Sequence, residues 1–192
     1  MKFSIITPSH KYQSYFDELY ISIIQQTYEN WEWIVYLNGE FKKDQLSKEI
    51  LNDERVKIYT NYDGNTNIGY VKNKAFSLGT GDVLVEMDHD DILTPDCLKE
   101  LATAFENNPE CGFVYSDNAT YHMEDKFVPY DPTFGWTHKN YDWNGKKLTA
   151  MNTFEPSSHS ISYIWYAPDH VRAWRKNTYE EIGGHNIELS MC

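Results

Sequence analysis

The chain has 192 residues, 41% of them hydrophobic, and a formal net charge of −12. This length suits one domain with a buried core, and the acidic balance excludes a nucleic-acid partner, because phosphate backbones need basic surfaces. No apolar run approaches the ~18 residues of a membrane helix, and the first residues form no secretory signal. We therefore expect a cytoplasmic protein without an integral membrane segment, with peripheral attachment to a membrane as an alternative.

Strands and helices alternate along the first part of the chain. Apolar runs predict strands at 3–7, 31–37, 56–59, 83–87 and 113–115. Helical spacing, caps and first-turn prolines predict helices at 15–26, 43–51, 71–78 and 95–107. This alternation is typical of an α/β fold with a mainly parallel sheet and helices on both faces.

The pattern changes after residue 117. Residues 118–168 are loop-rich and dense in aromatic residues, with a strand predicted at 161–166 and a short helix at 177–182. Three tryptophans could stack on sugar rings or pack in a core, and the sequence leaves both readings open. They are Trp136, Trp143 and Trp165.

The predicted strand at 83–87 leads directly into three carboxylates, Asp88, Asp90 and Asp91. Like charges this close repel one another unless a cation or hydrogen-bond donors neutralise them. Hard divalent cations prefer oxygen ligands, and Mg²⁺ often shares its shell with substrate phosphates. The alternative is a solvated acidic turn that caps the helix beginning near Pro95.

Polar loops follow three of the predicted strands, at 7–10, 38–40 and 88–91. The carboxyl ends of parallel strands meet at one edge of a sheet, and ligands of open α/β sheets bind there. This convergence favours the metal site over the solvated turn.

Four segments in this order resemble family 2 glycosyltransferases of the GT-A fold. They are 4–9 (SIITPS), 22–32 (SIIQQTYENWE), 68–75 (IGYVKNKA) and 86–91 (EMDHDD) with Pro95 and Leu98. Residues 166–185 resemble the acceptor-side half of that family. The resemblance implies a donor-binding half at 1–117 and an acceptor-side half at 118–192, within one GT-A domain.

The resemblance implies a metal-dependent transfer of a sugar from a nucleotide-diphosphate donor to the hydroxyl of a glycan or other acceptor, with inversion. It implies Mn²⁺ or Mg²⁺ as cofactor and favours a UDP-sugar, with a GDP-sugar left open. The implied nucleotide-binding residues are Thr7, Pro8, Ser9, Asn38, Lys72 and Asp88. The implied metal ligands are Asp90, Asp91 and His170, and His89 is expected to be a spacer.

Two positions depart from the family pattern. Asn38 stands where the family usually has an aspartate that contacts the base, and an amide adds a donor and carries no charge. The family's catalytic base usually follows the Gly183-Gly184 segment by about ten residues, so we expect it beyond Cys192 and expect this sequence to be truncated. The alternatives are an inactive nucleotide-sugar-binding module and a nucleotidyltransferase, although loop 7–10 lacks the glycines of the latter.

Overall fold

The computed structural model describes residues 1–120, 130–143, 145–164 and 168–190. The chain divides into two compact units. The first comprises Met1–Val114 and Ala173–Cys192, and the second comprises Tyr115–Arg172.

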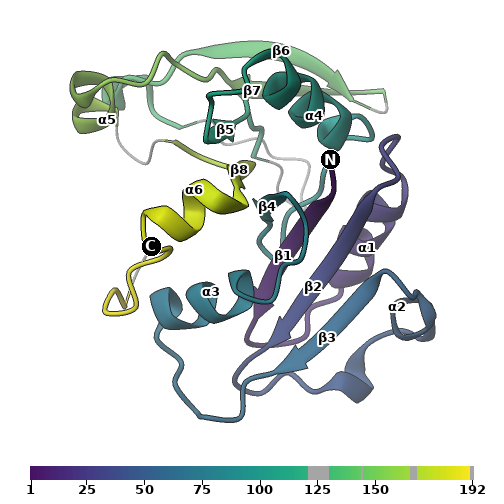
Figure 1. The fold of residues 1–192 in the computed structure, drawn as a ribbon. Coiled ribbons are helices and arrows are strands. Elements are labelled where there is room, and N and C mark those ends of the chain that lie inside the picture. Colours follow the sequence, from purple (N-terminus) through teal and green to yellow (C-terminus); the bar gives the residue numbers. More distant parts are fainter. Residues whose placement is uncertain (121–129, 144, 165–167, 191–192) are drawn as a thin grey trace. The chain divides into compact units, whose positions relative to one another are not determined.

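The first unit is built on a sheet with the strand order β3-β2-β1-β4-β8-β5, in which β1 to β4 pair in parallel (Figure 1). Its strands are β1 (Phe3–Ser9), β2 (Trp31–Leu37), β3 (Val56–Thr60), β4 (Val83–Glu86), β5 (Phe113–Tyr115) and β8 (Arg172–Arg175). Its helices are α1 (Phe16–Ile24), α2 (Lys48–Asn52), α3 (Ile68–Phe76), α4 (Cys97–Asn107) and α6 (Lys176–Glu181). The chain passes between the units within β5 and β8.

Alternate residues of β2 face opposite layers of helices. Trp33 stacks on Phe16 of α1, with ring centroids 5.4 Å apart. Ile34 and Tyr36 belong to the core cluster that includes Phe76 of α3. Both faces of the strand are therefore buried, which explains its nearly continuous apolar run and confirms the prediction of helices on both faces of a mainly parallel sheet.

Strand β1 continues two residues past its predicted end. β4 pairs with β1 only from Phe3 to Ile6, whereas β2 pairs with β1 as far as Ser9. The backbone nitrogen of Pro8 faces the side of β1 where β4 no longer pairs. Proline has no N–H to donate, but within the described residues no strand lies there to accept one, so no hydrogen bond of the sheet is lost. Pro8 therefore does not end the strand.

The second unit contains an antiparallel hairpin that the sequence analysis does not predict. Its strands are β6 (His138–Trp143) and β7 (Lys146–Met151), and its helix is α5 (Ser158–Tyr163). The strand predicted at 161–166 is wrong over 161–163, which are helical, and residues 165–166 lie outside the described part. The helix forms there because Ser157 and Ser160 make a reciprocal capping box at its first turn. Trp136 is buried and packs on Phe154 as a core residue.

Within the described residues, none of the helices combines the length and apolar character needed to cross a membrane.

Glu32 joins the amino ends of β1 and β2 to the turn before β4. Its Oε1 accepts hydrogen bonds from the Ser4 hydroxyl at 2.6 Å and the Thr80 N–H at 2.7 Å. Its Oε2 pairs with Lys2 Nζ at 2.8 Å. Burial alone would raise the pKa of Glu32, but these donors outweigh it and lower that pKa to about 2.

This network predicts a pH-dependent contribution to stability. The folded-state pKa lies below the unfolded value, so the contribution is complete above about pH 4.5 and is lost as the pH falls towards 2. Glu32→Gln should lower the free energy of unfolding by about 2–3 kcal/mol at pH 7 and by much less at pH 3. Urea unfolding at both pH values measures this, with the exposed Glu29→Gln as the matched control. An equal loss at both pH values would contradict the assignment.

Candidate functional site

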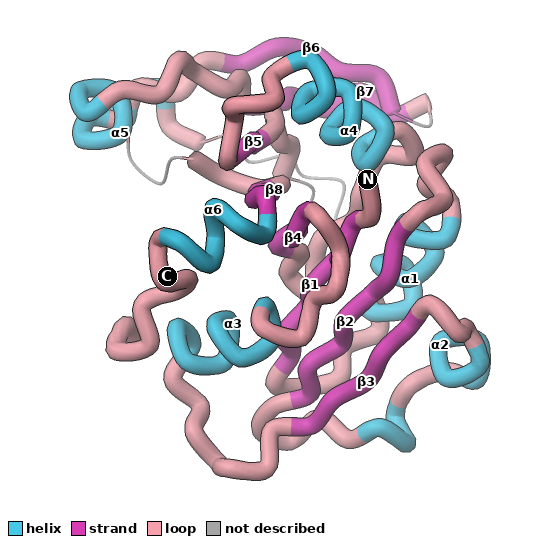
Figure 2. The backbone as a smooth tube through the Cα atoms, viewed as in Figure 1, coloured by secondary structure: helices cyan, strands magenta, loops and turns pink. Residues whose placement is uncertain are grey.

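The carboxyl ends of β1, β2 and β4 carry the polar loops that the sequence analysis predicts to meet. We call this region the carboxyl edge and define it by Ser9, Asn38 and residues 88–91. The backbone N–H of Asn38 donates to the Ser9 carbonyl at 2.8 Å, so the ends of β1 and β2 are joined directly. Figure 2 shows the loops after β1, β2 and β3 as one group at the lower end of the sheet.

Gly39 allows the loop after β2 to lie against the loop after β1. It has a φ of 60°, and a Cβ there would come within 3.1 Å of the His10 carbonyl oxygen. That carbonyl accepts hydrogen bonds from the N–H groups of Glu40 and Phe41, at 3.1 and 3.2 Å. A side chain at position 39 would strain the backbone and open this contact.

The acidic segment begins where β4 leaves the sheet. The Met87 N–H still donates to the Ile6 carbonyl at 3.1 Å, and the chain then turns at Asp88. The Asp88 side chain is 34% exposed, Asp90 is exposed, and Asp91 is half-buried. Three carboxylates within four residues are therefore accessible to a ligand.

Lys72 is buried beside this segment. Its Nζ donates to Glu86 Oε1 at 2.5 Å and lies 3.8 Å from Asp88 Oδ1. Glu86 is fully buried in β4, so Lys72 supplies a cation to a carboxylate that water does not reach. Lys72 is expected from the resemblance to bind the nucleotide, and its buried partner Glu86 is not predicted from the sequence.

A second group approaches Glu86 from the chain after α6. His185 Nε2 lies 3.8 Å from Glu86 Oε2, and His185 Nδ1 is 2.7 Å from the Tyr179 hydroxyl. That hydroxyl also accepts the His185 backbone N–H at 3.1 Å. Burial raises the pKa of Tyr179 to about 12, and the charge of Glu86 adds to the effect. Tyr179 therefore stays protonated, and its hydroxyl shares one hydrogen bond with His185 Nδ1 while the other ring nitrogen, Nε2, faces Glu86.

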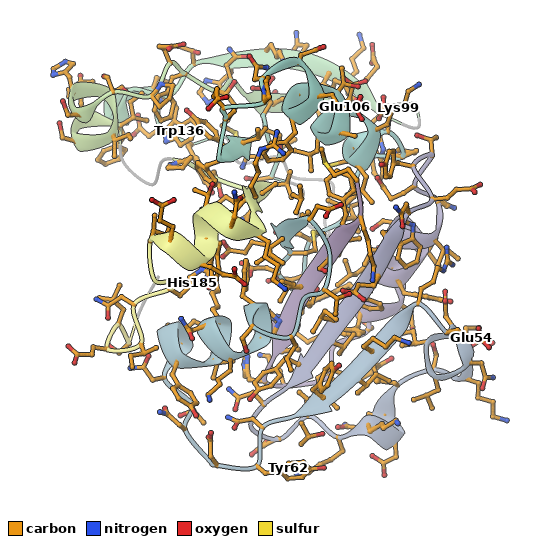
Figure 3. All side chains as sticks on the ribbon, viewed as in Figure 1. Glu54, Tyr62, Lys99, Glu106, Trp136 and His185 are labelled. Carbon is orange, nitrogen blue, oxygen red and sulfur yellow. The ribbon has the colours of Figure 1, made fainter. Side chains whose placement is uncertain are left out.

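The labelled side chain of His185 in Figure 3 lies beside α3 and α6. Its ring contacts Phe76 of α3, with centroids 4.8 Å apart, and its carbonyl accepts from Asn73 Nδ2 at 3.1 Å. The segment that includes Gly183 and Gly184 thus packs against α3 within the first unit and brings His185 next to Glu86.

His89, expected to be a spacer, contacts the loop after β1. Its Nε2 is 3.3 Å from Gln13 Nε2, and its ring meets that of His10 edge-on at 5.6 Å. Burial lowers the pKa of His89, and the charge of Asp90 opposes that shift. His89 therefore ties the acidic segment to the loop of β1.

The other predicted site residues lie as follows. Thr7 is fully buried, and its hydroxyl accepts from the indole N–H of Trp33 at 2.9 Å. Pro8 is buried within β1, and the Ser9 hydroxyl donates to the Lys11 carbonyl at 3.1 Å. His170 belongs to the second unit, where its Nδ1 is 3.2 Å from Asp169 Oδ1. Its part in a metal shell stays a prediction.

Comparison with known proteins now places the chain. The family model described as glycosyl transferase family 2 matches residues 4–162. The chain belongs to this family. This family 2 chain is 33% identical over 113 residues to the glucosyl-dolichyl phosphate glucuronosyltransferase of Haloferax volcanii. The match covers 57% of the chain and only 36% of that relative, so the chain spans about a third of its length.

Two solved structures show the GT-A fold for the family 2 chain. S. aureus TarS 1-349 in complex with UDP-GlcNAc superposes with a TM-score of 0.64 at 18% sequence identity. The superposition covers 96% of this chain and 48% of the TarS chain. The mannosyltransferase PcManGT from Pyrobaculum calidifontis, in complex with GDP-Man and Mn²⁺, has a TM-score of 0.63 and 14% identity. That superposition covers 97% of this chain and 48% of the PcManGT chain. The predicted fold class is confirmed.

The buried pair of Lys72 and Glu86 gives a direct stability test. Lys72→Met should lower the free energy of unfolding by about 3–5 kcal/mol, because it leaves Glu86 buried without its cation. The double variant Lys72→Met/Glu86→Gln should recover much of that loss, since no uncompensated charge remains.

Chemical denaturation of the single and double variants measures their free energies of unfolding and so gives the interaction energy of the pair. Lys74→Met, an exposed lysine on the same helix, is the matched control and should cost less than about 0.5 kcal/mol. A cost for Lys72→Met no larger than this control would contradict the pairing.

Proposed function

We propose that this chain binds a nucleoside-diphosphate sugar at the carboxyl edge and acts as a metal-dependent, inverting glycosyltransferase. The observation that carries the proposal is the accessible acidic segment at the end of buried β4, on the same edge as Ser9 and Asn38. The relatives support it, because solved GT-A structures of this shape hold UDP-GlcNAc or GDP-Man.

The donor set at the carboxyl edge fits a hard divalent cation. The carboxylates of the acidic segment that are exposed or half-buried are those of Asp88, Asp90 and Asp91, and buried Glu86 brings a further carboxylate oxygen close to Asp88. Oxygen ligands of this kind suit Mn²⁺ and Mg²⁺, and the Pyrobaculum structure holds Mn²⁺. When bound, the ion would offset the charge that develops on the leaving diphosphate. His170 is the further ligand that the sequence analysis proposes.

The chain's own residues prepare the edge for an anionic donor. Lys72 offsets part of the negative charge of Asp88, at 3.8 Å, and so lessens its repulsion of a diphosphate. Asn38 and Ser9 lie at the ends of the neighbouring strands and would take the nucleoside. We assign Asp88 to the ribose and the metal.

The acceptor side of the proposal rests on the resemblance. We assign the aromatic-rich residues 118–192 to an acceptor with a reacting hydroxyl, such as a glycan. A carboxylate base would deprotonate that hydroxyl, and its residue stays unassigned. The cytoplasmic location stays a prediction.

Nucleotide binding should require the metal. UDP or GDP should bind in the presence of Mn²⁺ or Mg²⁺ and bind at least tenfold more weakly in EDTA, because the carboxylates repel a diphosphate until a cation intervenes. Isothermal titration calorimetry of each nucleotide, with and without metal, measures this. Equal affinity in EDTA would overturn the metal-dependent part of the proposal, and no binding to either nucleotide would overturn the donor site.

Asp90→Asn tests the same site from the protein side. It should abolish metal-dependent binding and leave the melting temperature unchanged or higher, since it relieves repulsion between neighbouring carboxylates. Asp82→Asn removes one charge from the opposite end of the same strand and should bind nucleotide normally. Early melting of Asp90→Asn with nucleotide binding retained would identify the segment as a structural cap.

A further inference from the structure

We infer that Asn61 sets the nucleobase preference of this site, by holding the Asn38 side-chain amide so that its NH₂ group is the one available to the base. The inference rests on the proposed function, because it takes the ligand to be a nucleoside diphosphate. Asn61 directly follows β3, and its backbone N–H donates to the Leu37 carbonyl at 2.8 Å, at the end of β2. It therefore stands next to Asn38 in space although 23 residues separate them in sequence.

Two backbone groups determine which end of the Asn61 amide is nitrogen. Its Nδ2 donates to the Asn65 carbonyl oxygen at 2.7 Å, and its Oδ1 accepts the Asp63 N–H at 3.4 Å. A backbone carbonyl can only accept and a backbone N–H can only donate. If the amide were reversed, its oxygen would face the Asn65 carbonyl oxygen and its NH₂ group would face the Asp63 N–H, so both hydrogen bonds would be lost. The orientation of Asn61 is therefore determined without reference to Asn38.

The orientation of Asn38 follows from that of Asn61. The same Asn61 Nδ2 lies 3.0 Å from the Asn38 side chain, so the atom it meets has to be the acceptor, Oδ1. Asn38 is only 8% exposed, and its backbone is held by Ser9. Within the described residues, the Asn38 amide nitrogen has no hydrogen-bond partner. A nearly buried side chain thus keeps one donor group for a ligand.

An NH₂ group selects base edges that present acceptors. The pairing edge of uracil carries two ring carbonyls on either side of one N–H, and that of cytosine carries a carbonyl and a ring nitrogen lone pair. The pairing edge of guanine carries two donor groups and one carbonyl. The arrangement of Asn61 and Asn38 therefore favours a pyrimidine nucleoside diphosphate over GDP.

The test compares the affinities of UDP, CDP and GDP, measured calorimetrically with Mn²⁺. The unchanged chain should bind UDP or CDP at least tenfold more tightly than GDP. Asn61→Asp presents only acceptors to Asn38, so the Asn38 amide should reverse and that ratio should fall by about tenfold. Asn61→Ala removes the orienting contact altogether and should lower the ratio as well.

Asn65→Ala is the matched control, because it changes the same loop and removes a side chain that caps the Asn67 N–H, yet it keeps the backbone carbonyl used by Asn61. Its pyrimidine-to-guanine ratio should match that of the unchanged chain. Circular dichroism confirms folding of each variant, and Asn61→Ala serves if Asn61→Asp does not fold. Tight binding with the ratio unaltered by both Asn61 variants, or equal affinities in the unchanged chain, would overturn the inference alone. No nucleotide binding by the unchanged chain would overturn the proposed function itself.

Discussion

The carboxyl edge depends on one buried ion pair. Lys72 and Glu86 are both removed from water, and neither charge is tolerable there alone. The pair joins α3 to the end of β4, two residues before Asp88 and the rest of the acidic segment. His185 and Tyr179 complete the surroundings of Glu86 from a distant part of the chain. A pair of this kind adds little net stability, but it determines where α3 meets β4.

The loops around this pair hold one another by short backbone contacts. Gly39 allows the loop after β2 to lie against His10 in the loop after β1. His89 of the acidic segment contacts His10 as well. Asn61 brings the start of the β3–α3 connection to Asn38. Each loop of the proposed nucleotide site is therefore held by a neighbouring loop, so the site is largely formed before a ligand binds.

The strands and most helices of the first 115 residues follow their sequence pattern closely, because long apolar runs and helical spacing leave few alternatives. The helix predicted at 43–51 does not form as one piece: a 3-10 turn spans Lys43–Gln45 and α2 begins at Lys48. The β6–β7 hairpin was missed although the pair Asn144-Gly145 is a strong hairpin signal. Strand β8 was missed because four residues that begin and end with arginine show no strand pattern. The partners of Lys72 and Asn38 could not be predicted, since sequence alone does not tell which face of a helix or loop meets a given strand. The alternation of strands and helices, with polar loops after three strands, predicted the carboxyl edge, and the contacts within it came only from the structure.

We propose above that residues 88–91 hold a metal-bound nucleotide at the carboxyl edge. Crystals of the protein soaked with MnCl₂ and UDP, measured at the manganese absorption edge, test it most directly. We expect an anomalous peak bound by carboxylates of this segment, with the diphosphate on the same ion and the uracil against Asn38. A manganese peak away from residues 88–91, or a nucleotide bound elsewhere on the molecule, would contradict it.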